Sequence, residues 1–167
     1  MRIALPNAIV GLIAALSIGA CTVPTSRDAP PESQVLFVCE HGNVKSLMAA
    51  SYFNRLAIER GLPYRAATRG TAPDSTTVPP AIVAGLRNEG FDVAAFQPVA
   101  VSAADVATSQ RVILINTSLP ESISVAGTKE ERWTDVPAAS ADYAAASAAL
   151  KQHVGALIED LSRSERN

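Results

Sequence analysis

Three features that often point directly to function are scarce in this sequence. It has only two cysteines in 167 residues, aromatic residues make up 5%, and the formal net charge is −2. The basic residues are scattered singly, without runs or interleaved aromatics, which argues against nucleic acid as the main partner. With two cysteines and two histidines we expect no metal site and no cofactor. A chain of this length is typical of one domain large enough to bury a core.

Residues 1–20 have the pattern of a secretory signal. Arg2 precedes an apolar run over residues 8–16, and small residues lead to Ala20 and Cys21. This ending resembles the bacterial lipoprotein signal, in which the cysteine is acylated and becomes the first mature residue. Residues 21–33 are rich in Pro and Ser and are predicted to be a tether. We therefore expect export to the periplasmic side of the bacterial cell envelope and attachment to the lipid bilayer through Cys21; plain signal cleavage or an uncleaved anchor are the alternatives.

Lipidation of Cys21 would leave the exported domain with Cys39 as its one thiol. No disulfide can then form within the domain. A lone cysteine in an oxidising compartment is either buried and inert or kept for its chemistry, so the surroundings of Cys39 have to decide between the two.

From Gln34 onward, strand patterns alternate with helix patterns. Strands are predicted at residues 35–38, 64–71, 111–116 and 131–134, and helices at residues 45–60, 79–89, 102–107 and 140–161. Ser140 is the expected N-cap of the last helix, with Asp142 in its first turn. The alternation predicts an α/β fold, a three-layer sandwich with a central parallel sheet of about four strands and helices on both faces, formed by residues 34–167. Ligands of such sheets bind beyond the carboxyl ends of the strands, where Cys39 falls.

The loop after Cys39 has the composition of an oxyanion cradle. It joins a strand to a helix that starts near Lys45 and Ser46, so backbone N–H groups at the helix N-terminus would face a small concavity. The same field favours the nucleophilic thiolate. The residues predicted to bind phosphate here are Glu40, His41, Gly42, Asn43, Val44 and Lys45.

The segment from Val35 to Ser46, followed by Met48 and Ala49, resembles the signature of the low-molecular-weight protein tyrosine phosphatases and of the related thioredoxin-coupled arsenate reductases. The resemblance implies that Cys39 attacks phosphorus, that Lys45 clamps the phosphoryl oxygens and that Ser46 steadies the thiolate. It also implies a general acid in a loop before the last helix, where Asp135 stands.

Three departures from the family pattern accompany the resemblance. Lys45 stands where the family has arginine, the Gly42-Asn43 pair comes one residue late, and the acid loop reads Asp-Val-Pro instead of Asp-Pro, with no tyrosine directly after it. An ammonium is not equivalent to a planar guanidinium. We therefore expect Arg69, at the predicted end of the second strand, to reach the oxyanion and share the clamp; a surface arginine is the alternative.

Three functions remain open from the sequence. The first is a phosphomonoesterase, acting on a phosphate ester or a phosphoprotein such as a phosphotyrosine protein, through a cysteinyl-phosphate. The second is an arsenate reductase resolved by an external thiol, because the domain lacks the cysteines of an internal relay. The third is a non-catalytic oxyanion-binding lipoprotein.

Overall fold

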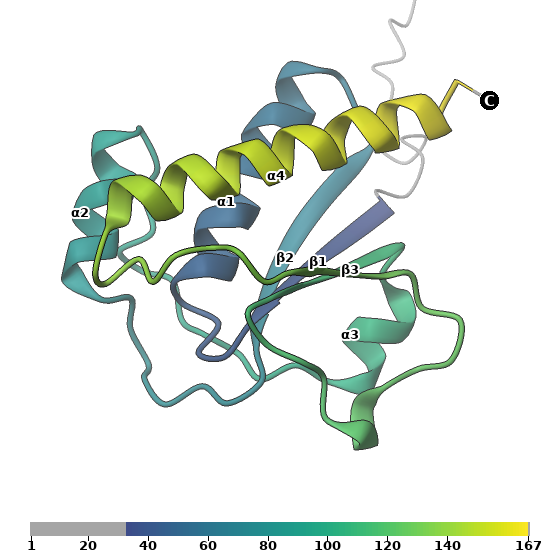
Figure 1. Cartoon of the computed structure of the whole chain (residues 1–167), viewed down its shortest axis with the longest axis horizontal. Helices are drawn as coiled ribbons and strands as arrows, with labels where there is room; N and C mark the ends of the chain where they lie inside the picture. The colour runs from purple at the N-terminus through teal and green to yellow at the C-terminus, as the bar shows by residue number, and fades with distance from the viewer. Residues whose placement is uncertain (1–32, 167) are drawn as a thin grey trace, which may run out of the picture.

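The computed structural model describes residues 33–166. The predicted signal segment 1–20, the acylation at Cys21 and the tether up to residue 32 lie outside these residues. The described part is an α/β fold with a central sheet between two layers of helices, as predicted (Figure 1). Its strands are β1 (Ser33–Cys39), β2 (Tyr64–Gly70), β3 (Arg111–Ile115) and β4 (Glu130–Trp133).

The four strands form one parallel sheet in the order β2-β1-β3-β4. β1 lies inside the sheet between β2 and β3, and the apolar residues of β1 and β3 are buried because helices cover both faces. Side chains alternate along β1: Phe37 and Cys39 join the core under the larger helical layer, whereas Leu36 and Val38 join a smaller core on the opposite face.

Two helices, α1 (Lys45–Glu59) and α4 (Tyr143–Ser164), cover one face of the sheet, and α2 (Pro80–Asn88) stands to one side, near the start of α4 (Figure 1). All three helices contribute apolar residues to one core that also includes strand residues, among them Phe53 of α1, Leu86 of α2 and Leu150 of α4. The short helix α3 (Ala103–Thr108) covers the other face through Val106, and the one-turn 3-10 helix η1 (Glu121–Ile123) follows β3. Among residues 33–166, no helix combines the length and the apolar character needed to cross a membrane.

Most predicted boundaries differ from the structure by one to three residues, and two of the differences concern named predictions. β1 begins at Ser33, one residue before the predicted start of the domain. The N-cap of α4 is Asp142, whose carboxylate accepts a hydrogen bond from the backbone N–H of Ala145, and not Ser140. Asp142 is the N-cap because it lies three residues before Ala145, whose backbone N–H has no acceptor within the helix. Ser140 lies in the turn before the helix.

The strand order creates a crevice between β1 and β3. The chain passes from β1 to β2 on one side and returns to β3 on the other, so the connections leave in opposite directions. Such a switch point is where α/β sheets of this kind bind ligands. Cys39 ends β1 and Asn116 follows β3, so both residues stand at this crevice.

Candidate active site

Cys39 is a free thiol at the end of β1 with an exposed fraction of only 3%. Its Sγ lies 3.1 Å from Ser46 Oγ, which lies in the first turn of α1. Thr68 of β2 continues this chain, because its hydroxyl donates to Ser46 Oγ at 2.7 Å. A thiolate can only accept hydrogen bonds, so when Cys39 is ionised Ser46 donates to the sulfur and Thr68 supports Ser46.

The loop of residues 40–44 joins Cys39 to the first turn of α1. Within the described part of the chain, the backbone N–H groups of residues 41–44 donate to no protein acceptor, and no side chain caps the start of α1. Free N–H groups beside the positive end of a helix form an anion-binding nest. Gly42 makes the turn with φ +77°, a left-handed conformation that side chains with a Cβ resist.

Residues at the end of β2 and just after it hold the loop through hydrogen bonds. The backbone N–H groups of Thr71 and Ala72 donate to the carbonyl oxygens of Cys39 (3.0 Å) and Glu40 (2.8 Å). Thr68 Oγ1 also lies 3.1 Å from the carbonyl oxygen of Gly42. The cradle is therefore held by tertiary contacts as well as by its own sequence.

A cavity of about 460 Å³ opens in front of Cys39. Its walls are mostly apolar. One wall is the loop, with Glu40, His41, Val44 and Lys45; the other lining residues are Pro79, Ala81, Ile82, Ile115, Asn116, Ala138, Ala139 and Ser140. An apolar pocket with a few convergent polar groups is typical of a site for a small organic ligand.

Lys45 supplies the cation of the cavity. Its Nζ donates to Asn116 Oδ1 at 2.8 Å, and Asn116 Nδ2 in turn donates to the carbonyl oxygen of Thr134 at 2.9 Å. Burial lowers the pKa of Lys45 from its usual value, and the nearby charges of Cys39 and Glu40 offset this only in part. Sequence reasoning missed both Asn116, the last residue of the predicted strand 111–116, and Thr68, which lies inside the predicted strand 64–71.

The other loop residues predicted to bind phosphate have different surroundings. Glu40 and Val44 line the cavity, and so does His41, whose Nδ1 lies 3.1 Å from Asp74 Oδ1. Asn43 is buried and donates through Nδ2 to the carbonyl oxygen of Thr77 at 2.8 Å. Its side chain therefore ties the loop to the segment before α2, while its backbone N–H stays in the nest.

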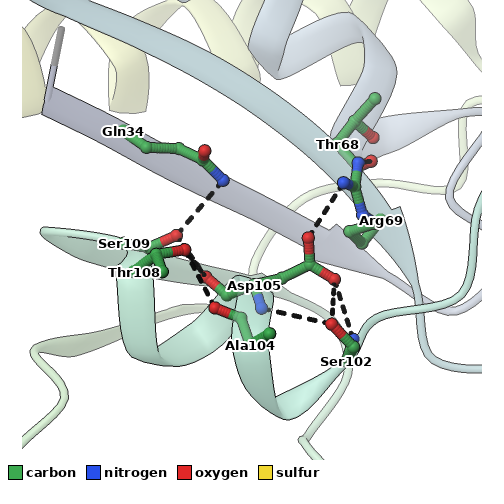
Figure 2. A network of polar contacts seen from close by, with 8 residues as sticks. All are labelled: Gln34, Thr68, Arg69, Ser102, Ala104, Asp105, Thr108 and Ser109. Carbon is green, nitrogen blue, oxygen red and sulfur yellow. Dashed lines mark hydrogen bonds and ion pairs between the residues drawn. The ribbon is translucent and has the colours of Figure 1, made fainter. Parts of the chain in front are cut away.

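Arg69 does not share the clamp with Lys45, contrary to the prediction. Its Nη2 lies 2.9 Å from Asp105 Oδ1 at the start of α3, and Asp105 in turn accepts hydrogen bonds from Ser102 (Figure 2). The reason is strand alternation: Arg69 pairs in register with Val38, whose side chain faces α3, whereas the neighbouring Thr68 points to the Cys39 face.

Asp135 is not among the residues that line the cavity. Its carboxylate is 70% exposed and lies 2.8 Å from His153 Nε2 on α4, and the His153 ring stacks on Trp133. The hydrogen bond with His153 holds the pKa of Asp135 below its usual value. The structure thus brings together Cys39 and Lys45 at the cavity, and it places Asp135 outside the lining; the role of Asp135 as general acid stays a prediction.

Among residues 33–166, no three His, Cys, Asp or Glu side chains lie close enough together to hold a metal ion. The polar groups that line the cavity include the Cys39 sulfur, residues of the loop and the Lys45 ammonium. These features define a class: an α/β protein with a cysteine, a strand-loop-helix turn and a lysine gathered at the carboxyl edge of a parallel sheet. The sequence model of the low molecular weight phosphotyrosine protein phosphatases matches residues 34–154, well over half of the chain, and the chain belongs to that family.

Solved structures of related proteins share this fold. The thioredoxin-dependent arsenate reductase Cg_ArsC1' of Corynebacterium glutamicum is 19% identical with a TM-score of 0.67; the alignment covers 81% of this chain and 65% of that protein. YfkJ from Bacillus subtilis is 22% identical with a TM-score of 0.69, covering 79% and 96%. The low molecular weight protein tyrosine phosphatase of T. tengcongensis is 20% identical with a TM-score of 0.65, covering 77% and 99%. No curated protein matches the chain.

Proposed function

We propose that this protein is a cysteine-dependent phosphomonoesterase that works through a cysteinyl-phosphate. The observation that carries the proposal is the position of Cys39 Sγ. It is 3.1 Å from Ser46 Oγ, and Cys39 directly precedes a loop in which the backbone N–H groups of residues 41–44 have no acceptor in the described part of the chain. Membership in a phosphatase family supports the same reading.

The proposed reaction has two steps. Cys39 Sγ attacks the phosphorus of a monoester, forming an S–P bond while the bond from phosphorus to the leaving oxygen breaks. Water then attacks the phosphorus, the S–P bond breaks, and phosphate leaves. The loop amides and Lys45 stabilise charge on the phosphoryl oxygens in both steps, and Ser46 stabilises the leaving thiolate in the second.

The cavity supports an organic ester as substrate, including an aryl phosphate such as phosphotyrosine. Its volume of about 460 Å³ leaves room beyond the phosphoryl group. The walls beyond the loop, formed by Pro79, Ile82 and Ala139 among others, are apolar and suit a ring or another compact apolar group.

Arsenate reduction is the second candidate, favoured by the fold shared with an arsenate reductase. In this scheme the Cys39 thiolate displaces hydroxide or water from arsenic(V) to form an S–As bond. An external thiol must then attack Cys39 Sγ, because Cys39 is the single cysteine of residues 33–166. The S–As bond breaks with its electron pair left on arsenic, which leaves as arsenite, and a second external thiol reduces the mixed disulfide to regenerate Cys39. A non-catalytic oxyanion-binding lipoprotein is the third candidate.

Attachment to a membrane is proposed from the sequence alone, as a lipid anchor on Cys21 on the periplasmic side of the cell envelope. A fatty-acid probe fed to cells should label the full chain, and Cys21→Ser should abolish the label and release the protein from membranes. An unlabelled wild type found in the soluble fraction contradicts the anchor.

One comparison separates the three functions. Wild type and Cys39→Ser are assayed for hydrolysis of p-nitrophenyl phosphate, for arsenate reduction with glutathione, and for vanadate binding. Hydrolysis by the wild type that Cys39→Ser abolishes supports the phosphatase. Reduction without hydrolysis supports the arsenate reductase, and vanadate binding without either reaction supports the binder.

A further inference from the structure

We propose that Asn116 is a positioning residue that orients the Lys45 ammonium toward the bound oxyanion, and so supplies the rigidity that lysine lacks by comparison with arginine. The inference rests on the proposed function, because it concerns the cation of the proposed oxyanion site. It depends on two hydrogen bonds of one side chain: Asn116 Oδ1 accepts from Lys45 Nζ at 2.8 Å, and Asn116 Nδ2 donates to the Thr134 carbonyl oxygen at 2.9 Å.

These two contacts determine the orientation of the amide. The Thr134 carbonyl can only accept a hydrogen bond, so the NH₂ group of Asn116 must face it. The side-chain oxygen must then face Lys45, which can only donate. No flipped arrangement satisfies both neighbours, so the site selects an amide over a carboxylate or an apolar side chain.

The backbone of Asn116 is also adapted to this role. It has φ +50° and is the one non-glycine residue with positive φ in the described part of the chain. Asparagine tolerates the left-handed region better than most residues, but the conformation still costs energy. Here it directs the side chain from the end of β3 across the mouth of the crevice to Lys45.

The need for such a partner follows from the chemistry of lysine. A guanidinium presents a planar fork that matches two phosphoryl oxygens, whereas an ammonium is a point charge on a flexible stem. Lys45 is partly desolvated at the cavity wall. When Asn116 accepts one N–H of the Lys45 ammonium, the other two N–H groups of Lys45 have defined directions and can both donate to a bound anion. The Lys45 side chain then loses less conformational entropy when the anion binds.

The same amide connects the cation to the opposite wall of the cavity. Thr134 directly follows β4, and the segment after it contributes Ala138, Ala139 and Ser140 to the lining. Asn116 thus joins the loop that holds the phosphoryl group to the segment that contacts the rest of the substrate. We expect its loss to weaken both oxyanion affinity and turnover.

The test is a double-mutant cycle between Asn116 and Lys45 in the full chain. Asn116→Gly removes the amide and also relieves the strain of the positive φ. Asn116→Ala removes the amide but keeps that backbone strain. Asn116→Asp keeps an acceptor for Lys45 but loses the donor to the Thr134 carbonyl oxygen. Each is made with Lys45 and with Lys45→Ala, and Ser118→Ala is the control on the same exposed loop. The readouts are vanadate affinity, measured by protection of Cys39 from iodoacetamide, and kcat and KM on p-nitrophenyl phosphate.

We expect Asn116→Gly and Asn116→Ala to weaken vanadate binding and kcat/KM by roughly ten-fold, as for one hydrogen bond to a charged group. Asn116→Asp should weaken binding at least as much, because its carboxylate repels the anion. In the Lys45→Ala background the Asn116→Gly change should be nearly silent. Equal losses in both backgrounds, or Asn116→Gly indistinguishable from wild type, overturn the inference alone. A wild type that neither binds vanadate nor hydrolyses the ester overturns the proposed function together with the inference.

Discussion

Gly42 and Gly70 pack backbone against backbone, one in the loop after β1 and the other at the end of β2. A Cβ on Gly42 would lie 2.6 Å from the backbone nitrogen of Gly70, and a Cβ on Gly70 would lie 2.7 Å from the carbonyl carbon of His41. Both contacts are closer than real Cβ atoms approach backbone. The shape of the loop of residues 40–44 thus depends on a glycine that lies outside it.

Gly70→Ala should therefore damage the site from a distance. The added methyl forces the loop away from β2, so we expect a loss of about 1–3 kcal/mol in the free energy of unfolding and a failure of phosphate to protect Cys39 from alkylation. Gly155→Ala is the matched control, because its Cβ meets nothing within 4 Å and it lies in α4, where alanine is the better helix former. Phosphate protection that survives Gly70→Ala would show that the loop keeps its shape without this contact.

Ser46→Ala should slow the chemistry of Cys39 without unfolding the protein. The Ser46 hydroxyl is buried between the sulfur and Thr68, and a hydrogen bond to a charged acceptor contributes about 1.5–3 kcal/mol. We expect iodoacetamide alkylation at neutral pH and hydrolysis of p-nitrophenyl phosphate both to fall by roughly ten-fold or more. Ser51→Ala removes a hydroxyl from the same helix that bonds only the Leu47 carbonyl, and it should react like wild type. Equal rates of alkylation and hydrolysis in Ser46→Ala and wild type would show that the Ser46 hydroxyl does not stabilise the Cys39 thiolate.

Asp135→Asn distinguishes a general acid from a partner of His153. A general acid contributes about a hundred- to ten-thousand-fold when the leaving group is poor. Because Asp135 lies against His153 and outside the cavity lining, we expect similar, small changes in kcat/KM on phenyl phosphate and on p-nitrophenyl phosphate. His153→Gln should reproduce the effect. A loss confined largely to phenyl phosphate would restore Asp135 as the acid and require the loop to move on substrate binding.

Asp105→Asn should change how stability depends on pH. Burial alone would raise the pKa of Asp105, but hydrogen bonds from Ser102 and Arg69 outweigh it, so the pKa is lowered. A carboxyl with a lowered folded pKa contributes stability that is present above its unfolded pKa of about 4 and lost as the pH falls through the folded value. Urea unfolding of Asp105→Asn should show a deficit of about 1–3 kcal/mol at pH 7 that shrinks below pH 4. Asp92→Asn, at an exposed aspartate, is the control. A deficit that is constant between pH 7 and pH 3 contradicts the role of the charge.

The helices and strands could be predicted because a short stretch of sequence encodes each of them. The apolar run that ends at Cys39, the helical stripe that includes Phe53 and the stop at Gly61 each need only a short window of sequence. Alternation of strands and helices then implies a parallel sheet with both faces covered, which the structure confirms. The candidate nucleophile, the loop and the cation follow from the same window, since Cys39, Lys45 and Ser46 lie in one strand-loop-helix unit.

The remaining site residues depend on contacts between segments far apart in the chain. Thr68 and Arg69 are adjacent in sequence, yet the register of β2 against β1 sends Thr68 to Ser46 and Arg69 to Asp105. Asn116 meets Lys45 because the strand order places β3 beside β1. The sequence by itself determined the strands, the helices and the cysteine loop, because local periodicity and loop chemistry encode them. Only the tertiary structure decided which side chains complete the site, because strand register and sheet order set the direction of each side chain and no short window of sequence contains them.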